Sequence, residues 1–465
     1  MTSPRHAAPD LAQFGYTQEL KRTLSFTDLL FYGLIFMVPI APMAIFGGVF
    51  QASGGMIVLA YIVGVVALSF TAASFSQMTK AFPIAGSVYN FASRAIHPSV
   101  GFLAGWAILL DYLLVPSLLY LVAAMAMNGI ITVVPVWGWL LLFIAVNTVI
   151  NLTGIRITAR VTKIFIVGEL IVLAIFLIIG ITAIIGGKGN GWGLEPLFNS
   201  ETFSWSLIFG ATSVAVLSFL GFDGIAMLSE ENKESANTVG KSMMAALALA
   251  GLLFVAQTWV AALLVENPGK LIAEGDGTGT AFYDAAALAG GKWMFYLCAG
   301  ATALAWGFAD AMVAQVATSR LLYAMGRDGA LPRFLAKVSR SYSVPYNAIL
   351  LGSVLAIVLP GSLLIFLENP GDGVAVVGTL INFGAMIAFM TLHVSVVWHF
   401  VIKRRSSDLL LHLVSPIIGF VILGFVVWNA NLAAQIVGLI WLGVGFVIML
   451  VLLALKRNVS LVGMD

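Results

Sequence analysis

Apolar residues along this chain occur in long runs that are separated by short polar segments. A run of about 20 apolar residues is long enough to cross the hydrocarbon core of a bilayer as a helix. The pattern predicts twelve such membrane-spanning helices. Their approximate limits are 27–50, 55–78, 98–128, 135–153, 160–185, 206–229, 239–265, 292–323, 346–367, 374–401, 413–430 and 433–455.

The composition agrees with an all-α integral membrane protein. Of the 465 residues, 60% are hydrophobic and only 9% are charged, whereas soluble chains carry roughly 25% charged residues. No low-complexity tract, separate soluble domain or basic patch for nucleic acid is visible. The single cysteine, Cys298, lies in an apolar run, so we expect neither a disulfide framework nor a Cys/His metal site.

Lysine and arginine are distributed unevenly over the connecting segments. If the N-terminus lies inside, the inner segments hold all but three of the 23 Lys and Arg residues. The three on the outer side are Lys188, Lys270 and Lys292. Because cytoplasmic loops carry the excess of Lys and Arg, this distribution predicts twelve spans with both termini in the cytoplasm.

The ends of the chain and one outer segment complete the predicted organisation. The first 23 residues are polar and have no signal peptide, so residues 1–23 are expected to form a cytoplasmic segment. Residues 24–455 would form the membrane domain, and residues 456–465 a cytoplasmic tail. The longer outer segment, 266–291, either caps the outer face or is a solvated loop.

Two of the predicted spans are interrupted. The first contains MVPIAPM, whose two prolines remove helix hydrogen bonds, and the sixth contains SFLGFDG, whose two glycines flank Phe222 and Asp223. Backbone groups freed inside a bilayer are tolerated only where they line a cavity, and paired breaks in two halves are typical of transporter binding sites. Kinks without function are the alternative. The predicted substrate-binding positions at the breaks are Pro39, Ile40, Ala41, Pro42 and Gly221.

Four acidic residues lie near the middle of predicted spans, where no Lys or Arg is comparably deep. They are Asp111, Glu169, Asp223 and Asp310, in the third, fifth, sixth and eighth spans. Each costs about 2.5–3.5 kcal/mol at the centre of a membrane helix. They therefore either carry protons, because desolvation disfavours the charged form, or meet a visiting cation. Both interpretations indicate a proton-coupled or cation-binding path.

Structural roles are the alternative for each of these residues. Asp223 could cap the second half of its helix, and the other three acids could hydrogen-bond neighbouring spans. His393 could join a proton relay but is better explained as a packing histidine. Aromatic residues beside the acids either close over a ligand or stack on a cation, or they pack ordinarily between helices. They are Tyr112, Phe219, Phe222 and Trp306. We expect these four and the acids Asp111 and Asp223 to be substrate-binding, with Asp111 and Asp223 facing the amino group of the substrate.

Four stretches resemble the amino acid–polyamine–organocation superfamily of permeases. They are FPIAGSVYNFA at 82–92, GWAILLDY at 105–112, FLGFDGIAMLSEEN at 219–232 and SRLLYAMGRDGALP at 319–332. The resemblance implies two inverted five-helix repeats with broken first and sixth helices, plus two further helices. The repeats would occupy about 27–185 and 206–401, and the further helices about 413–455. It also implies a secondary transporter that works by alternating access.

Within this superfamily the chain resembles the bacterial putrescine importers, which implies a location in the bacterial inner (plasma) membrane. Asp111 matches a position that is acidic in polyamine and cationic amino acid carriers. Glu169 matches a lysine of some proton-coupled members, whose ammonium stands where sodium-coupled relatives bind sodium. The resemblance and the buried acids lead us to expect Glu169 and Asp310 to couple transport to protons, without a cofactor.

The substrate class stays open between an amine and an amino acid. Amino acid carriers of this superfamily usually have a glycine-rich first break, whose N–H groups hold the substrate carboxylate, whereas PIAP has two prolines that lack N–H groups. We therefore expect carbonyls at this break, which suit a small cationic amine such as a polyamine. Alternatives are an amino acid permease or exchanger and, from another class, a non-transporting amine sensor. The sequence shows no enzyme active site and predicts no particular oligomeric state.

Overall fold

The computed structural model describes residues 11–131, 133–277, 279–366, 370–430 and 432–454, and these residues fold almost entirely into helices. The first part of the chain forms η1 (Leu11–Phe14), α1 (Phe26–Met37), α2 (Pro42–Ala52), α3 (Ile57–Ala81), α4 (Ser87–Ala95), α5 (Pro98–Ile130), α6 (Val136–Leu152) and α7 (Ile155–Ile185). The rest forms α8 (Trp205–Ala215), η2 (Val216–Phe219), α9 (Gly224–Met227), η3 (Ser229–Glu231), α10 (Ala236–Leu263), α11 (Pro268–Glu274), α12 (Ala281–Gly290), α13 (Lys292–Leu304), η4 (Ala305–Asp310), α14 (Ala311–Arg327), η5 (Arg333–Ala336), α15 (Tyr346–Phe366), α16 (Pro370–Val396), η6 (Val397–Lys403), η7 (Leu410–Val414), α17 (Ser415–Trp428) and α18 (Leu432–Ala454).

Local sequence explains how the first predicted span is divided. Ser25 and Asp28 form a reciprocal cap at the start of α1, which satisfies backbone N–H groups there. Pro42 occupies the first turn of α2, a position where its missing N–H costs no helix hydrogen bond. α1 and α2 meet at an angle of 53°, so the predicted break in this span is confirmed.

The prediction of an all-helical membrane protein is also confirmed. Within the described ranges, nine helices are long and apolar enough to cross a membrane, and the bent pair α1–α2 makes a tenth. Two more apolar helices, Val136–Leu152 and Tyr346–Ser362, are shorter. The predicted tail at 456–465 and the first ten residues of the predicted N-terminal segment lie outside the described residues.

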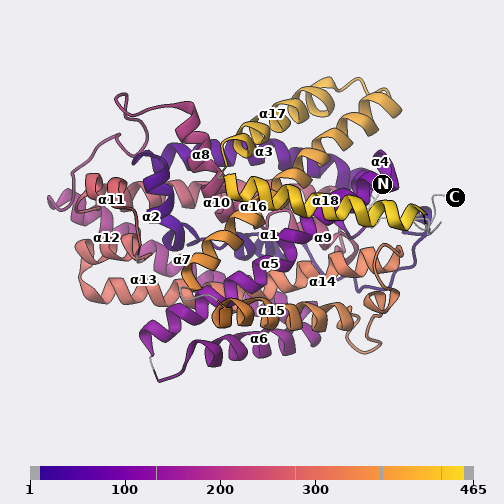
Figure 1. The fold of residues 1–465 in the computed structure, drawn as a ribbon, viewed down its shortest axis with the longest axis horizontal. Helices are drawn as coiled ribbons and strands as arrows, with labels where there is room; N and C mark the ends of the chain where they lie inside the picture. Colours follow the sequence, from indigo (N-terminus) through magenta and orange to yellow (C-terminus); the bar gives the residue numbers. More distant parts are fainter. Residues whose placement is uncertain (1–10, 132, 278, 367–369, 431, 455–465) are drawn as a thin grey trace, which may run out of the picture.

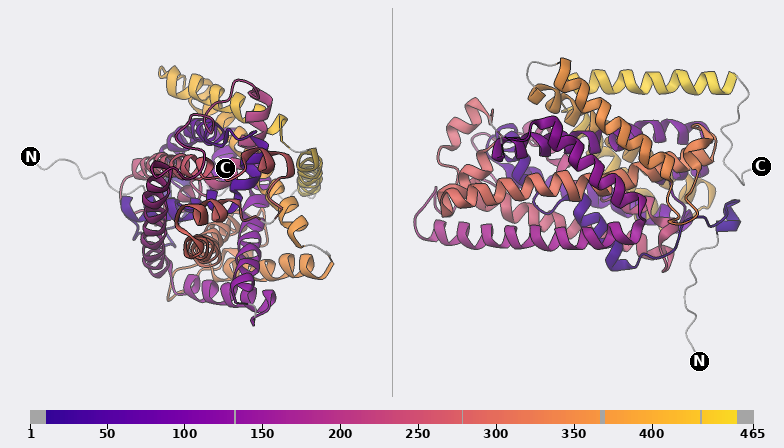
Figure 2. Two further views of the ribbon diagram at one scale, coloured as in Figure 1. Left: turned by 90° about the vertical axis from the view of Figure 1, so that its left-hand side faces the viewer. Right: turned by 90° about the horizontal axis from the view of Figure 1, so that it is seen from below.

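The long helices lie side by side along the long axis of the molecule (Figure 1). α3 packs against α10, and α5 packs against α16, α14 and α6. Seen along the long axis, the helices form a bundle, and α18 lies at its edge (Figure 2). α18 is fixed there by Trp106 and Trp441, which stack and donate reciprocal Nε1–H···O=C hydrogen bonds of 2.9 and 2.8 Å.

The segment predicted at 266–291 forms the two short helices α11 and α12, which lie at one end of the molecule (Figure 1). Both pack against α2. Asp276, between them, accepts hydrogen bonds from the N–H groups of Thr280 and Ala281, which begin α12. Of the two expectations for this segment, a cap fits the packing better than a solvated loop.

The other end of the bundle is closed by charged and aromatic side chains, including those of the N-terminal segment. Arg320 pairs with Glu231 at 2.9 Å, and Arg327 pairs with Glu230 at 2.9 Å. The Tyr16 ring lies 3.8 Å below the Arg327 guanidinium. Residues 23 and 24 donate backbone hydrogen bonds to the Glu231 carbonyl, so this segment is part of the closure.

Replacing Arg320 by methionine is expected to destabilise the protein by about 3–5 kcal/mol, because it leaves the Glu231 carboxylate buried and unpaired. Both side chains of this pair are only 1% exposed. The measurement is unfolding of the purified protein in detergent. Lys270→Met is the matched control, because its pair with Glu274 is exposed and 3.9 Å long. Equal stability of the two variants would contradict the prediction.

Candidate functional site

The break in the first span has a strained backbone, and one of its carbonyls accepts a hydrogen bond from another helix. Val38 adopts a φ of 50°, which is rare for a β-branched residue. The carbonyls of Val38, Ile40 and Ala41 accept hydrogen bonds from N–H groups three residues further on. The carbonyl of Pro39 accepts a 2.8 Å hydrogen bond from Gln257 Nε2 of α10. The expected carbonyls are present, but each already has one partner in this conformation.

The break in the sixth span lies directly against the first. Gly221 has a φ of 111°, and a Cβ there would be 2.5 Å from the Phe36 ring. A Cβ on Gly224 would also lie 2.5 Å from this ring. Glycine at both positions therefore lets α1 approach the break closely, with Phe36 filling the space.

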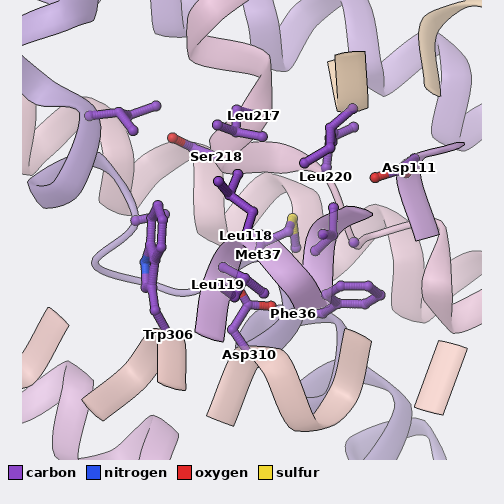
Figure 3. A pocket seen from close by; sticks show the side chains of 15 residues that line it. Phe36, Met37, Asp111, Leu118, Leu119, Leu217, Ser218, Leu220, Trp306 and Asp310 are labelled. Atoms are coloured by element: carbon purple, nitrogen blue, oxygen red, sulfur yellow. The ribbon is translucent and has the colours of Figure 1, made fainter. Parts of the chain in front are cut away.

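A small cavity of about 40 Å³ lies where the two breaks meet α5 and η4 (Figure 3). Its wall is mainly apolar, and its acids are Asp111 and Asp310. The lining residues are Phe36, Met37, Ala41, Ile45, Asp111, Val115, Leu118, Leu119, Leu217, Ser218, Leu220, Gly221, Trp306, Asp310 and Ile381. No lysine or arginine is among these described lining residues, so neither carboxylate faces a fixed cation in the cavity.

The four predicted acids are all buried, and two of them, Asp111 and Asp310, line the central cavity. Asp310 ends the π-helical turn η4, a type of turn that is often found at functional sites. Neither oxygen of Glu169 has a hydrogen-bond partner in the described part of the chain, although the side chain is only 4% exposed. The arrangement provides buried carboxylates that can exchange protons or hold a cation.

Asp223 differs from the other three acids because its carboxylate accepts hydrogen bonds from neighbouring residues. It accepts a 2.5 Å hydrogen bond from the Tyr112 hydroxyl and a 3.3 Å hydrogen bond from the Gly221 N–H. The Gly221 contact is of the kind expected if Asp223 stabilises the break. Tyr112 and Asp223 therefore lie together behind the cavity wall and are not among its lining residues.

The structure places the predicted site residues in two groups. Of those predicted, Ala41, Asp111, Gly221, Trp306 and Asp310 line the cavity. The remaining ones are buried but do not line the cavity: Pro39, Ile40, Pro42, Tyr112, Glu169, Phe219, Phe222 and Asp223.

Phe219 and Phe222 pack between helices in this conformation. Phe219 contacts Tyr61 and Phe254, and Phe222 contacts Phe75 and Phe389 with edge-to-face geometry or tilted rings. These are contacts of ordinary aromatic packing. A gating role for either ring stays a prediction.

Among the residues at the cavity and the breaks that were not predicted from the sequence, Phe36 and Gln257 contact the breaks directly. The Phe36 ring fills the space beside Gly221 and Gly224 of the sixth span. The sequence feature that could have identified it is a bulky residue shortly before the PIAP segment, together with these two glycines. Gln257 satisfies the Pro39 carbonyl, and its signal is an isolated polar residue in an apolar span. In both cases the partner becomes clear only from packing.

A larger cavity of about 580 Å³ adjoins the central one on the side of α11 and α12. The two cavities share Ile45, Leu118, Leu217 and Trp306. The larger cavity also touches Asp276, between α11 and α12. The larger cavity therefore extends from the central one toward the end where α11 and α12 lie.

His393 lies away from the acids. Its ring nitrogens contact Thr71 Oγ1 at 3.2 Å and Ser74 Oγ at 2.9 Å, which are both on α3. This environment is that of a packing histidine, as the sequence favoured. Across the described residues, no group of three or more His, Cys, Asp or Glu side chains is arranged to hold a metal ion.

Comparison with known proteins gives a consistent family match. A family model described as amino acid permease matches residues 24–459. The chain is 28% identical over 444 residues to the low-affinity putrescine importer PlaP of Escherichia coli K12, covering 92% of this chain and 93% of PlaP. It is 28% identical to the branched-chain amino acid permease BcaP of Lactococcus lactis, covering 86% and 87%. It is 25% identical to the methylthioribose transporter of Bacillus subtilis, covering 84% of each chain.

Proposed function

This chain belongs to the amino acid permease family, and we propose that it is a secondary active transporter that takes up a small organic amine, such as a polyamine, with protons. Members of this family and the matched relatives are transporters rather than enzymes. The proposed substrate class rests on the lining of the central cavity. This lining combines two carboxylates with an apolar wall, and its described residues include no basic side chain.

A short aliphatic diamine matches this chemistry. Its ammonium groups would interact with Asp111 and Asp310, which reach the cavity from different helices (Figure 3). The methylene groups would contact the apolar wall formed by residues such as Leu118 and Leu119. Asp223 and Tyr112, behind Asp111, would hold the broken helix in place. The similarity to a putrescine importer supports the same substrate class.

An amino acid is the second candidate, and one observation favours it. The Trp306 Nε1–H is buried and has no hydrogen-bond partner within the described residues, although Trp306 lines the cavity. An α-carboxylate could accept this donor. The similarity to a branched-chain amino acid permease supports this candidate.

The finer architecture is also part of the proposal. We infer twelve spans, with repeats at about 27–185 and 206–401 and two further helices at about 413–455. Contacts of α3 with α10, α5 with α14 and α6 with α15 each join elements five spans apart, which supports a repeat of five spans. Both termini would be cytoplasmic and the protein would lie in a bacterial plasma membrane, with α11 and α12 outside.

The test is uptake of labelled substrate into proteoliposomes with an imposed inward proton gradient. Putrescine is compared with a neutral and a cationic amino acid, and a protonophore is the control. Saturable putrescine accumulation that the protonophore abolishes is the expected result. Preference for an amino acid would favour the second candidate. Specific binding without any flux would indicate the non-transporting sensor instead.

A further inference from the structure

The helix that carries Asp310 and Trp306 is α-helical except for one wider, π-helical turn. η4 is a π-helical turn between the α-helices α13 and α14. A π turn inserts a residue into the helix, and this costs stability unless the surroundings fix it. Both cavity-lining side chains of this helix lie within the turn, so their direction depends on its register.

Two asparagines of α6 donate hydrogen bonds to backbone carbonyls of this helix. Asn147 Nδ2 donates to the Gly307 carbonyl at 3.0 Å, and Asn151 Nδ2 donates to the Met312 carbonyl at 3.0 Å. Both asparagines are buried, with exposed fractions of 0% and 2%. A carbonyl cannot donate, so the amide nitrogens must face these oxygens.

The spacing of these contacts matches a π turn and does not match an α turn. The two asparagines are four residues apart, which is about one turn of α6. The two carbonyls are five residues apart, which is one π turn. In a regular α-helix, the carbonyl one turn after Gly307 would belong to Ala311, and Asn151 would meet a different residue.

Close packing and a second hydrogen bond keep Asn147 in this position. A Cβ on Gly307 would lie 2.9 Å from the Ala123 Cβ and 3.0 Å from the Phe143 ring, so η4 approaches α5 and α6 closely. The second N–H of Asn147 donates to the Tyr120 hydroxyl of α5 at 3.1 Å.

From this geometry we propose that Asn147 is a positioning residue that fixes the π-helical register of η4 and thereby directs Asp310 and Trp306 toward the central cavity. Asn147 ties α5, α6 and η4 together at one point. Without it, a shift of one residue to α-helical register would turn a side chain by about 100° around the helix axis. Asp310 would then point away from the cavity. The transport consequence rests on the proposed role of Asp310 at the substrate site, whereas the register itself does not.

The experiment reads the register directly by cysteine labelling. The native Cys298 is replaced by alanine, and a single cysteine is placed at 309 or at 310. A small methanethiosulfonate reagent is applied to the purified protein with Asn147 and with Asn147→Leu. With Asn147, position 310 should react much faster than 309, because Asp310 lines the cavity and Ala309 is fully buried. With Asn147→Leu, this preference should be lost or reversed.

A matched control variant distinguishes a change in the helical register of η4 from a general loss of structure. Asn128 also donates to a backbone carbonyl, that of Val134 at 2.9 Å, but it does not contact η4. Asn128→Leu should keep the preference for position 310. If Asn147→Leu is not recovered as folded protein, Asn147→Ser gives the same test, because serine is shorter and lacks the amide that joins Gly307 to Tyr120. An unchanged preference in the recovered Asn147 variant would overturn the proposal.

Transport provides a second, separable readout. Asn147→Leu should lose proton-driven accumulation as Asp310→Asn does, while Asn128→Leu should keep it. If labelling shifts but Asp310→Asn transports normally, the register proposal holds and the proposed role of Asp310 in transport fails. If labelling does not shift, the register proposal fails whatever the substrate or the coupling ion is.

Discussion

Glu169→Gln is expected to abolish substrate accumulation driven by a proton gradient while leaving substrate exchange across the membrane. The two Glu169 oxygens are buried and have no hydrogen-bond partner in the described part of the chain, so no contact made by the carboxylate is lost. Glutamine has nearly the same shape but cannot take up and release a proton. The variant should therefore fold and bind substrate but fail to couple the two gradients.

The measurement uses proteoliposomes with the membrane potential clamped at zero. One pH unit supplies about 1.4 kcal/mol for each proton, which supports roughly tenfold accumulation with one proton per substrate. Glu169→Gln should stop at equal concentrations inside and outside, yet still exchange labelled for unlabelled substrate. Glu201→Gln, the same change at an exposed residue, is the control. Full accumulation by Glu169→Gln would make Asp310 the remaining candidate for proton coupling.

Sequence reasoning was reliable for features that depend on the bilayer. The length of each apolar run follows from the thickness of the hydrocarbon core, so long apolar helices were predictable, and in the described residues nine, or ten with the bent pair, are long enough to cross a membrane. The break at PIAP was visible because proline prevents helix hydrogen bonds wherever it lies. The short helices α4, α11 and α12 were not predicted, because they are shorter than a span and depend on packing against longer helices.

The candidate site was predictable only in part for a similar physical reason. A carboxylate in the middle of a span is costly in any fold, so Asp111 and Asp310 stood out before the structure was known. Contacts between distant residues carry no such signal. Asn147 and Gly307 are 160 positions apart, and Gln257 and Pro39 are 218 positions apart. Their pairing depends on how the helices are arranged, which the pattern of one span does not contain.

The second large effect is expected at Asp111, one of the two acids that line the described cavity. If it holds the substrate ammonium, Asp111→Asn removes one partner of a desolvated charge pair. Such a loss costs at least about 2 kcal/mol, which corresponds to a roughly 30-fold lower kcat/KM for amine uptake. Asparagine keeps the size of the side chain, so the amount of protein in the membrane should stay the same.

Two matched variants make this result specific to the charge at Asp111. Asp111→Glu keeps the charge and should retain part of the uptake, with a raised KM because the longer side chain intrudes into a cavity of about 40 Å³. Asp284→Asn makes the same change at an exposed residue of α12 and should transport normally. Normal amine uptake by Asp111→Asn at equal membrane levels would remove Asp111 from the substrate site. Asp310 would then be the only acid lining the described cavity, and one carboxylate would favour a substrate with a single ammonium group over a diamine.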